Sequence, residues 1–78
     1  MDKRTLTPQI EKQLKLIGDR IKAMRLEKGI SYERMAYECN LNRITYYNLE
    51  KGKNFQMRTL LLVLEYHNIS VKDFFIEL

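Results

Sequence analysis

Residues 41–52 read LNRITYYNLEKG, and they have the features of a short helix with defined ends. Asn42 is a suitable N-cap, because its side-chain oxygen can accept a hydrogen bond from a free backbone N–H in the first turn. Gly52 suits the other end, because glycine enters the left-handed conformation at little cost. The sequence therefore predicts a helix over residues 43–50.

Helical spacing divides this segment between two faces of different character. One face carries Tyr46, Leu49 and Glu50, of which Tyr46 and Leu49 are predicted core residues. The other face carries a cation, an aliphatic side chain, a phenol and an amide: Arg43, Ile44, Tyr47 and Asn48. A solubilising surface would more often carry Glu and Lys. The mixture suits the edges of bases in the major groove, which offer acceptors, donors and the thymine methyl group.

A second short helix precedes this one. Ser31 can act as its N-cap, and the helix is expected over residues 32–38. The turn that follows contains Asn40, which tolerates a positive φ angle, and Leu41, which is expected to be buried. Two short helices joined by such a turn form the pattern of a DNA-binding helix-turn-helix, here at about residues 31–51.

The remaining segments also have helical patterns. Thr7 and Pro8 suit the start of a long first helix, in which apolar residues recur at steps of four and three. These residues are Ile10, Leu14, Ile17, Ile21 and Met24. A fourth helix is expected over residues 57–67, and Ser70 can cap a fifth. The chain is therefore predicted to be all-α, with a flexible arm over residues 1–7.

Length and charge fit one small domain, residues 1–78, that has a polyanionic partner. The chain has 14 basic and 10 acidic residues, so its net charge is +4. Residues 20–58 contain nine basic residues (Lys or Arg) and four acidic residues (Asp or Glu). Residues 65–78 contain one basic and three acidic residues. The positive charge is therefore concentrated around the helix at residues 43–50, as expected of a surface that approaches phosphates.

Other classes of protein are poorly supported by the sequence. The single cysteine, Cys39, excludes an intrachain disulfide and fits a reducing cytoplasm. No apolar stretch approaches the ~20 residues that a bilayer requires, so we expect a cytoplasmic protein with no membrane partner. The single histidine, His67, is far from Cys39 in sequence, and there is no Gly-rich phosphate loop. We therefore expect no enzyme, no metal site and no cofactor.

Several short motifs occur together along the chain: residues 17–25 (IGDRIKAMR), 28–31 (KGIS), 35–36 (MA), 49–53 (LEKGK) and 69–71 (ISV), with Leu60 between the last two. In this combination the chain resembles the lambda-repressor-like family, the Cro and phage-repressor (Xre) helix-turn-helix regulators. The resemblance implies a five-helix all-α domain that binds operator DNA, usually as a homodimer. Here the first helix would be extended by about two turns.

The resemblance also implies roles for individual residues. Arg25 and Glu50 match the positions of a partly buried ion pair that ties the first helix to the recognition helix. The positions that face base edges are matched by Arg43, Ile44, Tyr47 and Asn48. The positions near phosphates are matched by Ser31, Tyr32, Lys51 and Lys53. The chain departs from the family pattern at three positions. Tyr32 stands where Gln is common, Asn40 where Gly is common, and His67 where a core Leu is common.

Several of these residues also have a second interpretation. Arg43 could contact a phosphate, which carries no sequence information, or remain solvated. Asn48 could be a weak helix former near a helix end rather than a reader of adenine. Tyr47 could contact the DNA backbone, a dimer partner, or the rings of Tyr32 and Tyr37. The sequence leaves these alternatives open.

The sequence thus predicts a transcriptional regulator that binds duplex DNA as a homodimer, with the helix at residues 43–50 in the major groove. The last two helices have more apolar side chains than one packing face needs, which predicts a dimer surface there. This surface consists of Leu61, Leu62, Phe75, Ile76 and Leu78. The long first helix is the competing dimer surface.

The alternative function is that of a protein-interaction module, such as an antitoxin that binds a toxin, with secondary DNA binding. A third function, RNA association, fits the charge but lacks an aromatic stacking platform. Short chains of the family that the sequence resembles include controller proteins of restriction–modification systems, phage regulators and antitoxins. The resemblance does not choose among them, nor between repressor and activator.

Overall fold

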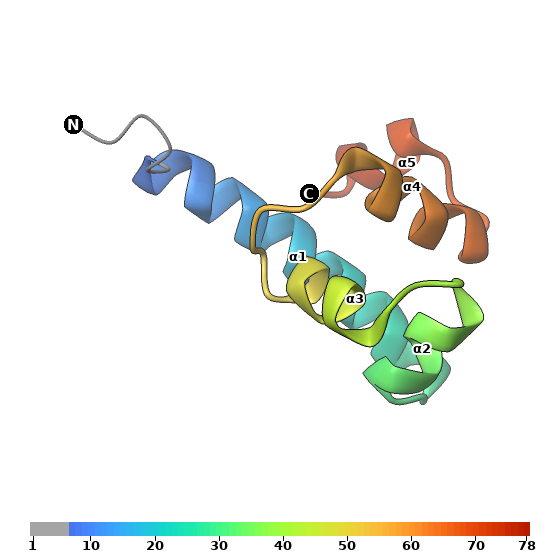
Figure 1. The fold of residues 1–78 in the computed structure, drawn as a ribbon. Coiled ribbons are helices and arrows are strands. Elements are labelled where there is room, and N and C mark those ends of the chain that lie inside the picture. The colour runs from blue at the N-terminus through green and yellow to red at the C-terminus, as the bar shows by residue number, and fades with distance from the viewer. Residues whose placement is uncertain (1–6) are drawn as a thin grey trace.

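Five helices form the fold within residues 7–78 (Figure 1). A computed structural model describes residues 7–78. The helices are α1 Pro8–Lys28, α2 Tyr32–Glu38, α3 Arg43–Glu50, α4 Met57–Tyr66 and α5 Val71–Ile76. The all-α, five-helix fold predicted from the sequence is therefore confirmed. Most of the predicted arm, residues 1–6, lies outside the described part, and its last residue, Thr7, is the N-cap of α1.

The helix ends follow from local side-chain chemistry. Four N-cap side chains each accept a hydrogen bond from a backbone N–H in the first turn, at 2.8–3.1 Å: Thr7, Ser31, Asn42 and Ser70. Four residues with positive φ angles turn the chain after a helix: Gly29, Asn40, Gly52 and Asn68. The fourth helix ends at Tyr66, one residue earlier than predicted, because His67 is its C-cap and Asn68 has a φ of 58°.

The core receives side chains from every helix. In the described part of the chain, ten apolar residues are buried: Ile21, Met35, Ala36, Cys39, Tyr46, Leu49, Leu60, Val63, Leu64 and Phe74. Around them, half-buried Leu41 anchors the turn after α2, and Phe55 anchors the loop before α4. Burial raises the pKa of the Cys39 thiol to about 11, so Cys39 stays protonated and packs as a small apolar residue.

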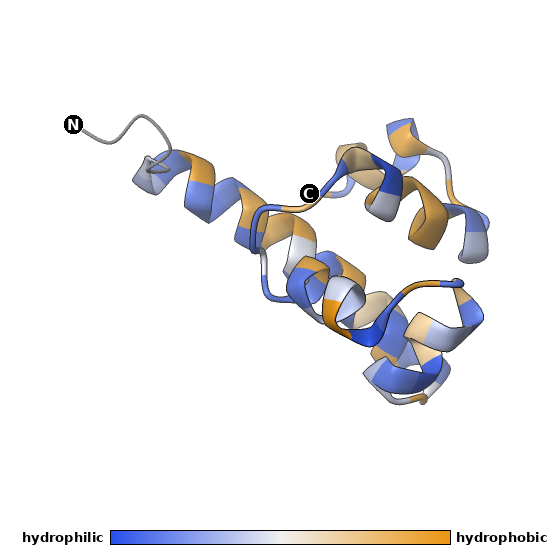
Figure 2. Cartoon of the chain, viewed as in Figure 1, coloured by the Kyte–Doolittle hydropathy of each residue, from blue (hydrophilic) through white to orange (hydrophobic). Residues whose placement is uncertain are grey.

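Only the C-terminal part of α1 packs against the other helices. Ile21 is fully buried, and Ile17 and Met24 lie against the core, whereas Ile10 is 45% exposed. The apolar stripe predicted along the whole helix therefore packs against the core from Ile17 onward, because the N-terminal turns extend beyond the remaining helices (Figure 1). Hydrophobic and hydrophilic segments alternate along the helix in Figure 2. Neither α1 nor any other helix within residues 7–78 is both long and apolar enough to cross a membrane.

Two glycines allow α1 and the end of α3 to meet backbone to backbone. A Cβ atom at Gly18 would lie 2.5 Å from the carbonyl oxygen of Glu50 and 2.6 Å from that of Leu49. A Cβ atom at Gly52 would lie 2.6 Å from the Cα atom of Lys15. Because backbone atoms cannot move aside as a flexible side chain can, this contact fixes the separation of the two helices.

We predict that Gly18→Ala destabilises the protein. Helix propensity alone would favour alanine by about 1 kcal/mol. The clash with the end of α3 should outweigh it and lower the free energy of unfolding by about 1–3 kcal/mol. Urea unfolding followed by circular dichroism measures this change. A Gly18→Ala protein more stable than the parent would contradict the packing described for α1 and α3.

Gly29 offers a comparison, because at this glycine only the backbone conformation opposes a side chain. At Gly29 an added Cβ meets no atom within 4 Å, but the φ angle is +69°. Gly29→Ala should therefore cost only the left-handed penalty of about 1–2 kcal/mol.

Candidate nucleic-acid interface

The inner face of α3 is fixed by a buried ion pair. Arg25 of α1 donates from Nε to Oε2 of Glu50 at 2.6 Å and from Nη2 to Oε1 at 3.0 Å. Tyr46 donates its hydroxyl proton to the same Oε2 at 2.5 Å. The other terminal nitrogen of Arg25, Nη1, donates to the carbonyl oxygen of Ile30 at 2.9 Å, immediately before the N-cap of α2. One guanidinium group therefore connects α1, the start of α2 and the end of α3.

Burial and hydrogen bonding within this network determine the ionisation of Arg25 and Tyr46. Arg25 is 9% exposed and Glu50 is 7% exposed, so the ion pair expected from the sequence is present and largely removed from water. The hydrogen bonds with Glu50 raise the pKa of Arg25 above its ordinary value, although burial opposes this. Burial and the hydrogen bond to Glu50 raise the pKa of the Tyr46 phenol far above its ordinary value. The network therefore keeps the Arg25 guanidinium charged and the Tyr46 phenol neutral at neutral pH.

The outer face of α3 carries the four residues predicted to face bases. Arg43 is exposed at the first position of the helix. Ile44 is 64% exposed although it is apolar and β-branched, and it has no packing role at this level of exposure. Tyr47 is 38% exposed, and Asn48 is half-buried.

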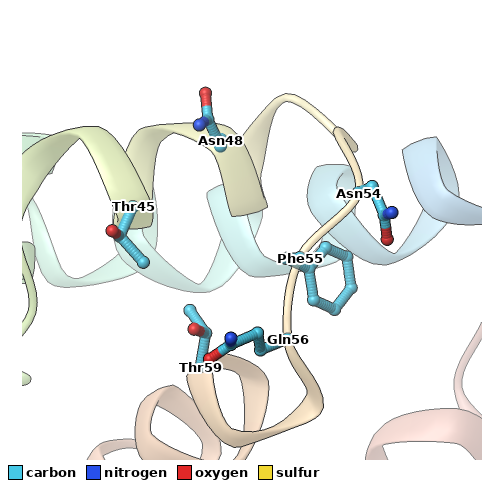
Figure 3. A pocket seen from close by; sticks show the side chains of 6 residues that line it. All are labelled: Thr45, Asn48, Asn54, Phe55, Gln56 and Thr59. Atoms are coloured by element: carbon cyan, nitrogen blue, oxygen red, sulfur yellow. The ribbon is translucent and has the colours of Figure 1, made fainter.

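These four residues do not form one cluster. Tyr47 packs against Tyr32 of α2, with ring centroids 5.2 Å apart and planes tilted by 53°. This contact is one of the alternatives that the sequence left open, and Tyr32, Arg43, Ile44 and Tyr47 line one hollow. Asn48 borders a second hollow, between α3 and the start of α4, lined also by Thr45, Asn54, Phe55, Gln56 and Thr59 (Figure 3).

Figure 3 identifies polar residues beside Asn48 that the sequence analysis did not select. The Thr45 side chain points from α3 towards α4, while Asn48 points away from it. Asn54 and Gln56 add two amides in the loop after α3. Their sequence signal is weak, because a polar loop is common, and only the fold brings this loop next to α3.

The residues predicted near phosphates lie at the edges of this surface. Ser31 caps α2 by accepting from the Arg34 backbone N–H at 3.1 Å, which leaves its hydroxyl proton free to donate. Tyr32 follows at the first position of α2 and is half-buried. Lys51 and Lys53 are exposed on either side of Gly52, with the Lys51 ammonium 5.3 Å from the centre of the Tyr47 ring.

Within residues 7–78, some basic residues form ion pairs, and others, on this surface and elsewhere, do not. Four basic residues outside it form ion pairs at 2.6–3.3 Å: Lys15, Arg20, Arg25 and Arg34. Within the described part, Arg43, Lys51 and Lys53 have no carboxylate partner. Unpaired cations beside an exposed short helix are available to phosphates and base acceptors.

Two short helices, α2 and α3, are joined by a tight turn, and α3 is anchored on one face and presents free cations on the other. This arrangement defines a helix-turn-helix DNA-binding domain. The helix-turn-helix family model matches residues 21–74. The chain belongs to the lambda-repressor-like (Xre) helix-turn-helix family, and it is a DNA-binding regulator of transcription.

A solved structure supports this assignment. The chain is similar to a point mutant of the restriction–modification controller protein C.Esp1396I, with 32% sequence identity and a TM-score of 0.70. The similarity covers 82% of this chain and 82% of the controller protein. No curated protein sequence matches the chain.

We predict that Arg25→Ala destabilises the protein by about 3–5 kcal/mol, because it leaves Glu50 buried without its cation. Arg34→Ala is the matched control, since the Arg34 side chain is 63% exposed and an ion pair at the surface adds little to stability. Urea unfolding measures both changes. If both variants were as stable as the parent, the Arg25–Glu50 pair would not anchor α3.

Proposed function

We propose that the protein regulates transcription by binding a specific duplex DNA site as a homodimer, with α3 in the major groove. The observation that carries this proposal is the outer face of α3, where an unpaired arginine and an exposed isoleucine project from a helix whose inner face is fixed. Arg43 would bind guanine through its N7 and O6 acceptors, and Asn48 would bind adenine. Ser31, Tyr32, Lys51 and Lys53 would contact phosphates and set the register.

A two-fold dimer would place two α3 helices about one DNA turn apart, ~34 Å. The proposed dimer surface is on α4 and α5. Leu61 is 43% exposed, Phe75 38%, Ile76 69% and Leu78 45%, while Leu62 is half-buried at its edge. Exposed apolar side chains of this number on two adjacent helices favour an interface between protein chains. Among short regulators, the match to a restriction–modification controller protein favours the controller class.

We expect the protein to select a defined site from a pool of random duplexes and to bind it more tightly than random DNA, with a steep dependence on salt. Arg43→Ala should lower affinity for that site by about 1–3 kcal/mol per half-site and relax specificity at one base pair. Lys53→Ala should weaken binding to all sequences and reduce the salt slope by about one per half-site. Fluorescence anisotropy at several salt concentrations measures both effects.

Arg34→Ala is the control for these variants, because Arg34 is an exposed arginine paired with Glu38 on the same helix. It should retain both affinity and specificity. Equal, weak binding of the parent to selected and random DNA would contradict a specific regulator. In that case the α4–α5 surface would be the main binding surface, as in a protein-interaction module.

The dimer surface is tested by the double variant Leu61→Glu and Ile76→Glu. Both side chains are exposed in the single chain, so the variant should fold, but its charges would be buried on association. We expect a monomer by sedimentation, with site binding weakened at least about tenfold. Leu26→Glu, at a 58% exposed position of α1, is the matched control and should leave the dimer intact. If the double variant remained dimeric, the dimer interface could not be the proposed surface on α4 and α5.

A further inference from the structure

The first turns of α1 lie outside the part of the chain that the family model matches. Residues 8–16, here called the α1 extension, precede the matched residues 21–74. In Figure 1 these turns project beyond the other helices. Ile10 is 45% exposed and Leu14 is half-buried. Apolar side chains on a helix that projects from its own domain leave water only if another surface covers them.

These apolar side chains continue the face of α1 that packs against the rest of the domain. Ile10 and Ile17 are seven residues apart, so they project from the same face of the helix. Ile17 packs against the core, and Ile10 lies two turns further out. The end of α3 bounds one edge of this face, because Gly52 lies against the backbone of Lys15.

The end of α5 bounds the other edge of the same face. Arg20 donates from Nη1 to Oε1 of Glu77 at 3.3 Å. On either side of Glu77, Ile76 is 69% exposed and Leu78 is 45% exposed. Ile10 precedes Arg20 by ten residues, which is ~15 Å along the helix axis. The α1 extension therefore begins beside the apolar end of α5 and continues away from it.

The occupant that best fits the α1 extension is α5 of a second copy of the chain. The helix α5 of the same chain is held ~15 Å away by the pair of Arg20 with Glu77. At 1.5 Å per residue, residues 71–78 would span ~12 Å and the α1 extension spans ~14 Å. Residues 8–16 contain two lysines and one glutamate, whereas residues 71–78 contain one lysine and two acidic residues. The two segments therefore match in length and have opposite net charge.

We propose that, in a two-fold dimer, the α1 extension of each chain packs against the α4–α5 surface of the partner chain. The proposal rests on the proposed function, which supplies the homodimer and its α4–α5 surface, and it adds the surface that covers the partner's α5. The contact occurs twice, because a two-fold interface is isologous. The first helix and the last two helices, which the sequence offers as competing dimer surfaces, are then two sides of one interface.

Ile10→Glu tests this contact at a position that the single chain leaves exposed. We expect the dissociation constant of the dimer to rise at least about tenfold, because a carboxylate would be buried at both symmetric contacts. Sedimentation equilibrium at several concentrations measures this constant, and circular dichroism checks that the variant folds. Leu16→Glu is the matched control, because Leu16 is 50% exposed in the same extension but projects from a different face of the helix. It should change the constant by no more than about twofold.

Cross-linking identifies the surface that the α1 extension contacts. One tagged chain carries Ile10→Cys, and a second chain with a different tag carries Ile76→Cys. The natural cysteine, Cys39, is buried. A short bismaleimide should join the two differently tagged chains to each other. Replacing Ile10→Cys by Leu16→Cys should abolish this cross-link, since position 16 faces away from the proposed contact.

The outcomes separate this proposal from the proposed function. A parent chain that is monomeric at every concentration would overturn the homodimer, and this contact with it. If Leu61→Glu with Ile76→Glu dissociates the dimer but Ile10→Glu does not, the contact of the α1 extension is overturned while the proposed function stands. Equal weakening by Ile10→Glu and Leu16→Glu, or equal cross-linking from positions 10 and 16, would overturn it as well, because the effect would not depend on the helix face.

Discussion

The ion pair between Arg25 and Glu50 is the constraint on which the arrangement of α1, α2 and α3 depends. A buried pair adds little net stability, because desolvation offsets much of the attraction between the charges. Its importance here is geometric, since the guanidinium group also donates to Ile30 before α2. The inner face of α3 and the segment before α2 are thereby bound to the same side chain of α1.

Close backbone contact also fixes the position of α3 against α1. Gly18 and Gly52 bring the backbones of α1 and the end of α3 within a distance that excludes a Cβ atom on either side. Directional hydrogen bonds therefore set the rotation of α3, and backbone contact sets its distance from α1. The proposed base contacts would depend on this precision, because hydrogen bonds to base edges require side chains placed within a few tenths of an ångström.

Much of this fold could be predicted from the sequence because its determinants are local. Caps such as Asn42 and turn residues such as Asn40 act within a few residues, and both behave in the structure as the sequence indicates. The site was less predictable, because its shape depends on contacts between helices. The pairing of Tyr32 with Tyr47, and the separation of Asn48 into a second hollow, are set by how α2 and α4 lie against α3.

The position of Glu50 connects the anchor to the electrostatics of the exposed end of α3. An anion in the last turn of a helix is unfavourable, because the C-terminal end of the helix dipole is negative. Arg25 neutralises this anion, and Leu49 and Tyr46 bury the same end in the core. The N-terminal end, with its positive dipole and the Arg43 cation, is left at the surface. Holding α3 by its C-terminal turn therefore presents the end of the helix that a polyanion attracts.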